Sequence, residues 1–186
     1  MKEELRVSLT NYHSVVEHSP NAVLVHQDYK IIYANPAALR MFDAGELSLL
    51  INKSLFDFIH PDFHELVKQR VEHMINSGLN APMTEMQFLK LGNITIDVEV
   101  QGTSIVFEGE KAIHVALRDI SKRKVAEESL RKSEEKFAKV FSTSPVAISI
   151  AELSTGKYID VNTAFLKKMG YKKEEVIGFT STELNV

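Results

Sequence analysis

The chain has 186 residues, of which 44% are hydrophobic and 25% charged, and its formal net charge at pH 7 is -3. This composition is ordinary for a soluble protein. The length allows one domain and part of another, or two small domains. The net charge gives no basis for binding nucleic acid or an anionic membrane. The chain has no cysteine, no apolar run near the ~20 residues that span a bilayer and an acidic start unlike a signal peptide, so we expect a cytoplasmic protein without disulfides, thiolate metal sites or a membrane segment.

The first elements are predicted from β-branched runs and a helix-start signal. Residues 1–18 are polar with scattered apolar positions and predict a lead-in helix. Two short β-branched runs, residues 22–27 and 30–34, predict a β-hairpin with a tight turn between them. Asn35 and Pro36 then begin a short helix, because Asn caps helices well and Pro is tolerated at the first helical position. We therefore expect Asn35 to be a structural cap.

A longer helix and three strands follow. Residues 61–77 predict a helix, because apolar side chains recur at spacings of three and four. Residues 84–91, 94–107 and 111–120 predict strands separated by turn-forming sequences. The order of two strands, helices and three strands predicts an α+β domain with five antiparallel strands.

The segment after the last strand is charged and continuous. Residues 121–136 contain no Gly or Pro and consist mostly of good helix formers, and Ser121 can cap the helix. Its apolar seam consists of Ala126, Leu130, Phe137 and Val140, with Ser133 between. The spacing is that of a two-helix coiled coil, but the seam is only two heptads long. We predict a solvated connecting helix with a weak coiled-coil seam.

The pattern of the first domain then restarts. Ser19, Pro20 and Ala22 recur at a constant offset as Ser144, Pro145 and Ala147. Asn35 recurs as Asn162, which we expect to be a second structural cap. The second unit stops before any counterpart of the long helix and the last three strands.

Both units resemble PAS sensor domains of the S-box type. In the first unit the resemblance is carried by Ser19-Pro20-Asn21-Ala22 and by residues 32–38, 56–62 and 118–124. In the second unit it is carried by Ser144-Pro145, residues 160–165, Gly170-Tyr171 and Val176-Ile177-Gly178. The resemblance divides the chain into a lead-in helix (1–18), a PAS domain (19–120) with PAC-like strands (84–120), a signalling linker helix (121–136) and a truncated second PAS domain (137–186).

The resemblance implies a five-stranded antiparallel sheet with helices on one face, around a pocket that in some relatives holds haem, flavin or a small metabolite. It also implies an output domain, most often the histidine kinase of a two-component phosphorelay, and a homodimer that pairs through the N-terminal and linker helices. We expect the signal to pass through Asp119, Ile120, Ala126, Leu130 and Phe137. The alternatives are a ligand-free dimerisation scaffold and the PAS region of a transcriptional or cyclic-dinucleotide regulator.

Inward positions of the strands and long helix either line such a pocket or fill a core. The candidates are Val23, Val25, Ile32, Leu39, Phe42, Leu66, Phe88, Ile96, Val98, Val115 and Leu117. Their apolar character argues against a charged metabolite and leaves a small apolar metabolite or a non-covalent flavin. Covalent flavin–cysteine chemistry is excluded because the chain has no Cys.

The histidines do not form a haem or metal motif. Leu66 stands about where haem-binding relatives place the iron ligand, and His64 and His73 project from opposite sides of the predicted helix. His64-Glu65 resembles the phosphoacceptor of histidine kinases, but the following residues depart from that motif. Without a nucleophile with its base, a marked acid pair or a Gly-rich phosphate loop, we expect no catalytic residue and no metal site in this chain.

Overall fold

The computed structural model describes residues 15–185, which divide into two compact units between Lys124 and Val125. Most of the predicted lead-in helix, residues 1–14, lies outside the described residues, and residues 15–17 are helical. Each unit has its own hydrophobic core.

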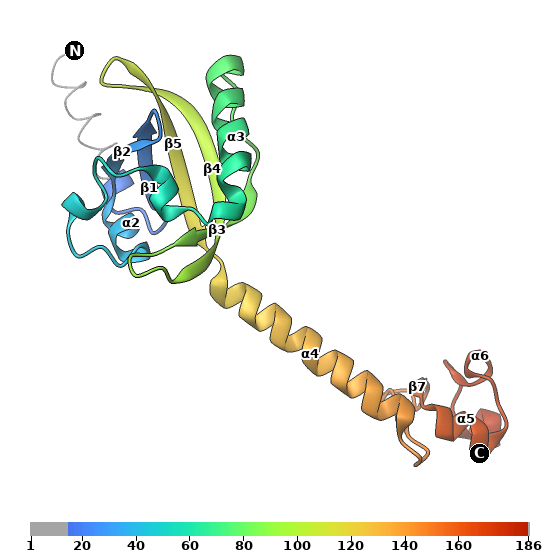
Figure 1. The fold of residues 1–186 in the computed structure, drawn as a ribbon. Helices are drawn as coiled ribbons and strands as arrows, with labels where there is room; N and C mark the ends of the chain where they lie inside the picture. The colour runs from blue at the N-terminus through green and yellow to red at the C-terminus, as the bar shows by residue number, and fades with distance from the viewer. Residues whose placement is uncertain (1–14, 186) are drawn as a thin grey trace. The chain divides into compact units, whose positions relative to one another are not determined.

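The first unit is a five-stranded antiparallel sheet with helices on one face (Figure 1). Its elements are β1 (Ala22–Gln27), β2 (Lys30–Ala34), α2 (Pro36–Met41), three 3-10 helices (Leu47–Leu49, Leu55–Phe58 and Pro61–Phe63), α3 (His64–Ser77), β3 (Thr84–Leu89), β4 (Thr95–Phe107), β5 (Glu110–Asp119) and the start of α4 (Ser121–Thr143). The strand order is β2-β1-β5-β4-β3, so the first and last strands pair at the centre. The predicted α+β fold is confirmed.

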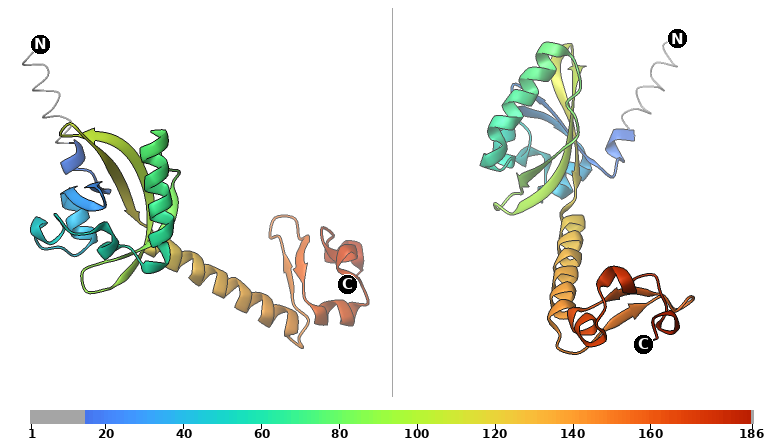
Figure 2. Two further views of the ribbon diagram at one scale, coloured as in Figure 1. Left: turned by 45° about the horizontal axis from the view of Figure 1, so that its top comes forward. Right: turned by 90° about the vertical axis from the view of Figure 1, so that its right-hand side faces the viewer.

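The two faces of this sheet have different neighbours. The right-hand view of Figure 2 shows α3 on one side of the sheet and the helical residues 15–17 on the other. The face under α2, α3 and the 3-10 helices, called here the covered face, carries the main core, with Leu24, Ile31 and Leu117 fully buried. The opposite face is called the outer face.

Three predicted pocket residues lie on the outer face, which corrects the sequence prediction. Val23 and Val25 alternate with the core residue Leu24 and, together with Ile32, line a groove on the far side of the sheet. The prediction failed because residues 22–26 are all buried. The sequence of this strand therefore shows no alternation of apolar and polar residues that would distinguish one face of the sheet from the other.

Leu66 is a second correction. The side chains of Val67, Val71 and Met74 on α3 are buried against the sheet, whereas Leu66 is 36% exposed. The apolar stripe of this helix is wider than the surface that the sheet covers, so the residue at its edge faces solvent. The helix ends at Gly78, whose φ of 68° is the left-handed conformation that a C-terminal glycine supplies.

The second unit is small. It contains the rest of α4 and then β6 (Ser149–Ala151), β7 (Tyr158–Val161), α5 (Thr163–Met169), α6 (Lys173–Val176) and α7 (Ser181–Leu184). The strands β6 and β7 pair antiparallel, and the buried core consists of Val161, Phe165 and Val176. Helix α4 continues past the predicted end at residue 136 to Thr143.

Candidate functional site

The interior beneath α3 is nearly filled. A cavity of about 30 Å³ remains there, with Phe88 and Val115 among its lining residues. The side chain of Met74 occupies the adjacent space, and its Sδ and Cε lie 2.9 Å from the position of a Cβ built on Gly102. The other inward candidates pack in the same core: Leu39, Phe42, Ile96, Val98 and Leu117.

This packing leaves room for about one water molecule, whereas small-molecule sites usually measure about 300 to 1,000 Å³. A flavin or haem does not fit the cavity as the side chains are packed. The position that corresponds to the haem ligand, Leu66, is also turned away from the interior. Within residues 15–185, no three His, Asp or Glu side chains gather in an arrangement that could hold a metal ion.

His26 is a buried polar residue on the covered face that the sequence analysis did not single out. It is 1% exposed, and neither ring nitrogen has a hydrogen-bond partner among the described residues. Burial lowers its pKa from 6.5 to about 4, although the nearby Asp28 carboxylate acts in the opposite direction. The Tyr29 ring stacks on the imidazole at 6.0 Å between centroids. A buried unpaired polar group costs about 1–3 kcal/mol, so this side chain requires an explanation.

The groove on the outer face is much larger. Its volume is about 890 Å³, and it is lined by Val16, Val23, Val25, Gln27, Ile32, Tyr33, Ile105, Phe107, Glu108, Glu110 and His114. The Tyr33 hydroxyl donates to Glu17 over 2.7 Å, which attaches the described end of the lead-in segment to β2. The outer face therefore presents a groove with both apolar and polar lining residues beside that segment.

Asn35 links elements on both sides of the sheet. Its Oδ1 accepts from the backbone N–H groups of Val23 and Ala38 at 2.9 Å, and its Nδ2 donates to the carbonyls of Val16 and Asn21 at 3.0 Å. One buried amide thus caps α2 and holds the helical residues that precede β1.

Asn162 makes the corresponding contacts in the second unit. Its Oδ1 accepts from the N–H groups of Ile148 and Phe165 at 2.9 Å, and its Nδ2 donates to the Val146 carbonyl at 2.8 Å. The two asparagines are the N-caps of α2 and α5. The same local geometry is therefore built twice.

The junction between β5 and α4 is fixed by backbone and side-chain hydrogen bonds. The Asp119 carboxylate accepts from the Ser121 N–H at 2.8 Å, and the Ile120 N–H donates to the Asp97 carbonyl at 2.9 Å. The Ser121 hydroxyl does not cap the helix as predicted, but accepts from the Asp97 N–H of β4 at 3.1 Å. The start of α4 is thereby attached to the neighbouring strand as well as to β5.

Ion pairs hold the first turn of α4 against β3 and β4. Lys124 Nζ lies 3.0 Å from Glu85 and 3.1 Å from Asp97, and Arg123 lies 2.8 Å from Glu85. Hydrogen bonds from Lys124 and Arg123 lower the pKa of the Glu85 carboxyl, and those to Glu85 and Asp97 raise the pKa of Lys124. We call Glu85, Asp97, Ser121, Arg123 and Lys124 the junction cluster.

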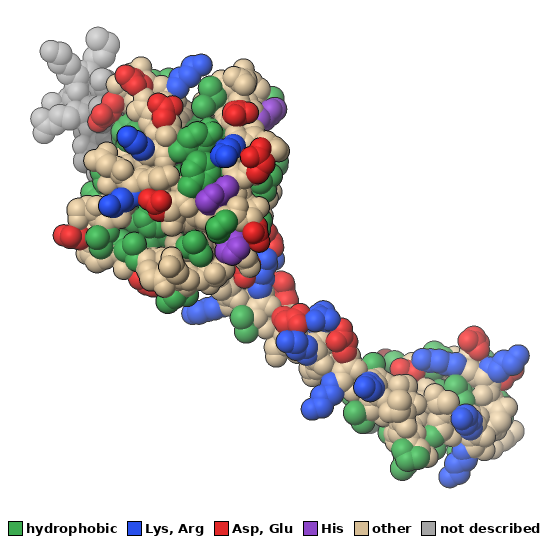
Figure 3. Space-filling view, in the orientation of Figure 1, with side chains coloured by type: hydrophobic (Ala, Val, Ile, Leu, Met, Phe, Trp, Pro, Cys, Tyr) green, Lys and Arg blue, Asp and Glu red, His purple; other side chains and the backbone are tan. Residues whose placement is uncertain are grey.

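The apolar seam of α4 is exposed. Leu130 is 61% and Phe137 57% exposed, and the Phe137 ring stacks on Phe141 at 5.6 Å. Figure 3 shows acidic and basic side chains interspersed along the visible side of this helix. Arg131 contacts both Glu128, at 2.7 Å, and Glu135, at 2.5 Å. The helix therefore carries a solvated charged surface beside its exposed apolar positions.

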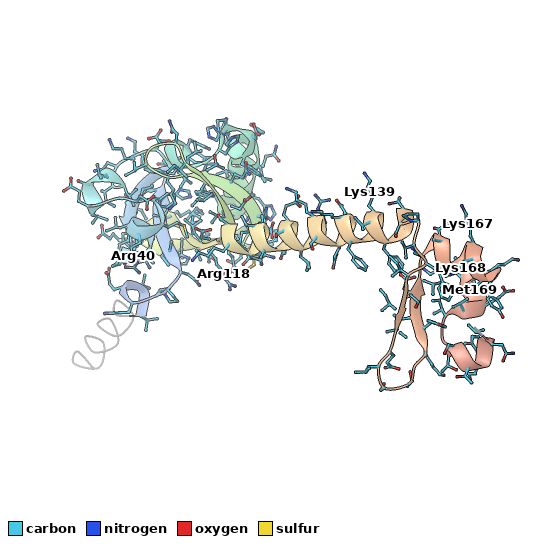
Figure 4. All side chains as sticks on the ribbon, turned by 90° about the horizontal axis from the view of Figure 1, so that it is seen from below. Arg40, Arg118, Lys139, Lys167, Lys168 and Met169 are labelled. Atoms are coloured by element: carbon cyan, nitrogen blue, oxygen red, sulfur yellow. The ribbon has the colours of Figure 1, made fainter. Side chains whose placement is uncertain are left out.

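Two polar hollows occupy similar places in the two units. The first, of about 340 Å³, is lined by residues that include Arg40 and Arg118, and the second, of about 580 Å³, by residues that include Lys167 and Lys168 (Figure 4). Both lie beside the helix that follows the capping asparagine. Their cations are on the surface, and no buried polar group marks either hollow as a binding site.

The first unit combines a five-stranded antiparallel sheet, helices on one face of it and a central strand that leads into a long helix. Comparison with family models gives its class: a PAS domain model matches residues 20–122, and a second PAS domain model matches residues 135–185. The chain belongs to the PAS domain family.

Curated relatives include two sporulation kinases of Bacillus subtilis (strain 168). The chain is 30% identical to sporulation kinase A over 152 residues, which cover 82% of this chain and 25% of the kinase. It is 26% identical to sporulation kinase E over 181 residues, which cover 95% of this chain and 23% of that kinase. The chain thus spans about a quarter of the length of these relatives.

Solved PAS domains share the fold. That of an HTR-like protein from Haloarcula marismortui has a TM-score of 0.52 at 20% identity and covers 64% of this chain and 97% of that one. A PAS domain from a two-component sensor histidine kinase has a TM-score of 0.51 at 16% identity, covering 61% and 97%. Among residues 15–185, no helix has the length and apolar character needed to cross a bilayer.

Proposed function

We propose that this chain is the sensory region of a histidine kinase, in which the first PAS domain passes a signal through α4 to a kinase domain. The similarity to two sporulation kinases supports the kinase output. In this proposal residues 19–120 form the sensor, residues 121–136 the linker helix and residues 137–186 the front of a second PAS domain.

The junction cluster is the observation that carries the proposal. β5 pairs with both β1 and β4 and continues into α4 without Gly or Pro. Lys124 attaches the first turn of the helix to Glu85 of β3 and Asp97 of β4, so a change in the twist of the sheet moves the helix. Asp119 and Ile120 lie at this junction, whereas Leu130 and Phe137 lie further along the helix.

A chimera tests the transmission. The segment of sporulation kinase A that matches this chain is replaced by it, and autophosphorylation is measured. We expect Asp119→Ala and Lys124→Met to change the rate severalfold, because each removes contacts that hold the start of α4 at the junction. Lys122→Met, in the same helical turn, is the matched control and should leave the rate unchanged. Equal rates in all four proteins would refute transmission through the junction.

The outer groove and the seam of α4 support a second part of the proposal, pairing with another copy of the chain. Both surfaces carry apolar side chains that are at least partly exposed, and the nearly filled interior favours the alternative of a ligand-free dimerisation scaffold. Native mass spectrometry distinguishes the two functions. A scaffold is dimeric without any bound molecule, and Leu130→Glu or Ile105→Glu makes it monomeric, whereas a ligand sensor carries or takes up a small molecule.

A further inference from the structure

His26 lies at the end of the covered face where three segments converge. The β1–β2 turn, the second half of α3 and the start of β5 surround a hollow of about 320 Å³. Its lining residues are His26, Gln27, Asp28, Tyr29, Val71, Ile75, Glu110, Lys111, Ala112 and Ile113. Its volume is about that of the smallest common ligand sites and far exceeds the cavity under Met74.

The imidazole beside this hollow has an unmet capacity for hydrogen bonding. Both ring nitrogens are buried and without a partner among residues 15–185. Neutral imidazole offers one N–H donor and one acceptor nitrogen. A buried polar group of this kind is normally satisfied by protein, water or a ligand. The missing partner therefore has to carry a donor, an acceptor or both.

Tyr29 is the side chain that stacks on the imidazole, and it lies in the tight turn between β1 and β2. Asp28 and Tyr29 have φ values of 46° and 63°, as the common two-residue hairpin turn requires at both central positions. The Tyr29 ring also contacts Phe56 at 5.0 Å, and Phe56 contacts His64 at the start of α3 at 4.9 Å. A displacement of Tyr29 thus has a contiguous route of packed rings to α3.

The charges around the hollow restrict the ligand. Asp28 and Glu110 are acidic and Lys111 is basic, so an anion would meet more negative than positive charge. Val71, Ile75 and Ile113 supply an apolar wall. A neutral hydroxyl group both donates and accepts, which is the complement of a neutral imidazole.

We propose that this hollow binds a small neutral hydroxyl compound with an aromatic or compact apolar body, whose hydroxyl hydrogen-bonds to His26 after the Tyr29 ring moves aside. The inference rests on the proposed sensory function and names the class of ligand. The rings of Phe56 and His64 carry the displacement of Tyr29 to α3.

Phenol is the probe for this site, and the chain of residues 1–186 is labelled with ¹⁵N-histidine for NMR. We expect saturable binding in the millimolar range and a shift of the His26 ring nitrogens, which are assigned by their loss in His26→Phe. His26→Phe should weaken phenol binding at least tenfold. His114→Phe, which changes the histidine on the outer face, is the matched control and should bind phenol as the unmodified chain does.

A melting curve shows whether His26→Phe is folded. Ile75→Trp, at a position of α3 that lines the hollow and is 41% exposed, fills the hollow and keeps His26, and so provides a second route to the same loss of binding. Unshifted His26 nitrogens at saturating phenol, or equal binding by His26→Phe and the unmodified chain, would overturn the site. Loss of binding in His114→Phe would place phenol in the outer groove and would overturn it as well. None of these results would alter the response of the kinase chimera to Lys124→Met, so the two proposals fail separately.

Discussion

The two faces of the five-stranded sheet are built differently. Under α2 and α3 the covered face is packed to a residual cavity of about 30 Å³, whereas the outer face holds a groove of about 890 Å³. The strands carry one histidine on each face, His26 of β1 on the covered face and His114 of β5 on the outer face. The two lie near each other along the sheet, since His114 pairs with Val25, the residue before His26. We have proposed a ligand site at the edge of the covered face and a pairing surface for another chain on the outer face.

Asn35 connects the two faces, and its removal is expected to have the largest effect. Asn35→Ala removes four hydrogen bonds and leaves the buried N–H of Val23 without its acceptor. We expect the free energy of unfolding of the first unit, measured by urea titration, to fall by about 4 kcal/mol. Asn162→Ala is the matched control and should leave the stability of the first unit unchanged. An effect below about 1 kcal/mol for Asn35→Ala would contradict the linking role.

Shortening one apolar side chain on each face compares how much packing on that face contributes to stability. Met74→Ala enlarges the covered cavity and should cost about 3 kcal/mol, whereas Ile105→Ala in the open groove should cost about 1 kcal/mol or less. Gly102→Ala should be tolerated better in the Met74→Ala background, because its Cβ then occupies space that the methionine vacates. Additive effects in this double-mutant cycle would show that Met74 does not occupy that space.

The lowered pKa values of His26 and His114 predict that the stability of the first unit depends on pH. The folded-state pKa of His26 is about 4 against an ordinary value of 6.5, so the unfolded chain takes up a proton first as the pH falls. Stability should therefore decrease from about pH 6.5 to about pH 4, by about 3 kcal/mol in all. His26→Phe should abolish this decrease. The half-buried His114, whose pKa burial also lowers, should contribute a smaller slope, and the variants are compared by urea titration at each pH.

The smallest effect is expected from the exposed ion pairs of the junction cluster. Lys124 and Arg123 lower the pKa of Glu85, so its contribution to stability is complete above the ordinary value of 4.5 and is lost as the pH falls below it. Glu85→Gln should slightly reduce stability at neutral pH and reduce the acid sensitivity in that range. Because the pair is exposed, the loss should shrink further in 1 M salt. A loss that salt does not change would indicate a packing effect.

Local signals in the sequence predicted much of the fold. The hairpin turn, the helix start at Asn35 and the restart at Asn162 each depend on neighbouring residues and were found from them. The face of β1 was misassigned because every residue from Ala22 to His26 is buried, and the exposure of Leu66 depends on how far the sheet extends under α3.

The contacts of the candidate sites could not be predicted in the same way. His26 was missed because its burial and lack of partners depend on α3 and β5, which are distant in sequence. The junction cluster joins Glu85, Asp97 and Lys124, and only strand register brings these together. The cavity size depends on the placement of the Met74 side chain, which no sequence pattern specifies.

Amide hydrogen exchange tests most directly whether the sheet and α4 move as one body at the junction. The informative amides are those of Asp97, which donates to the Ser121 hydroxyl, and Ile120, which donates to the Asp97 carbonyl. In Lys124→Met we predict faster exchange at both amides, with Leu24 and Val115 in the paired centre of the sheet unchanged. Unchanged exchange at Asp97 and Ile120 would contradict the account, because α4 would then be held without the ion pairs on which transmission is proposed to depend.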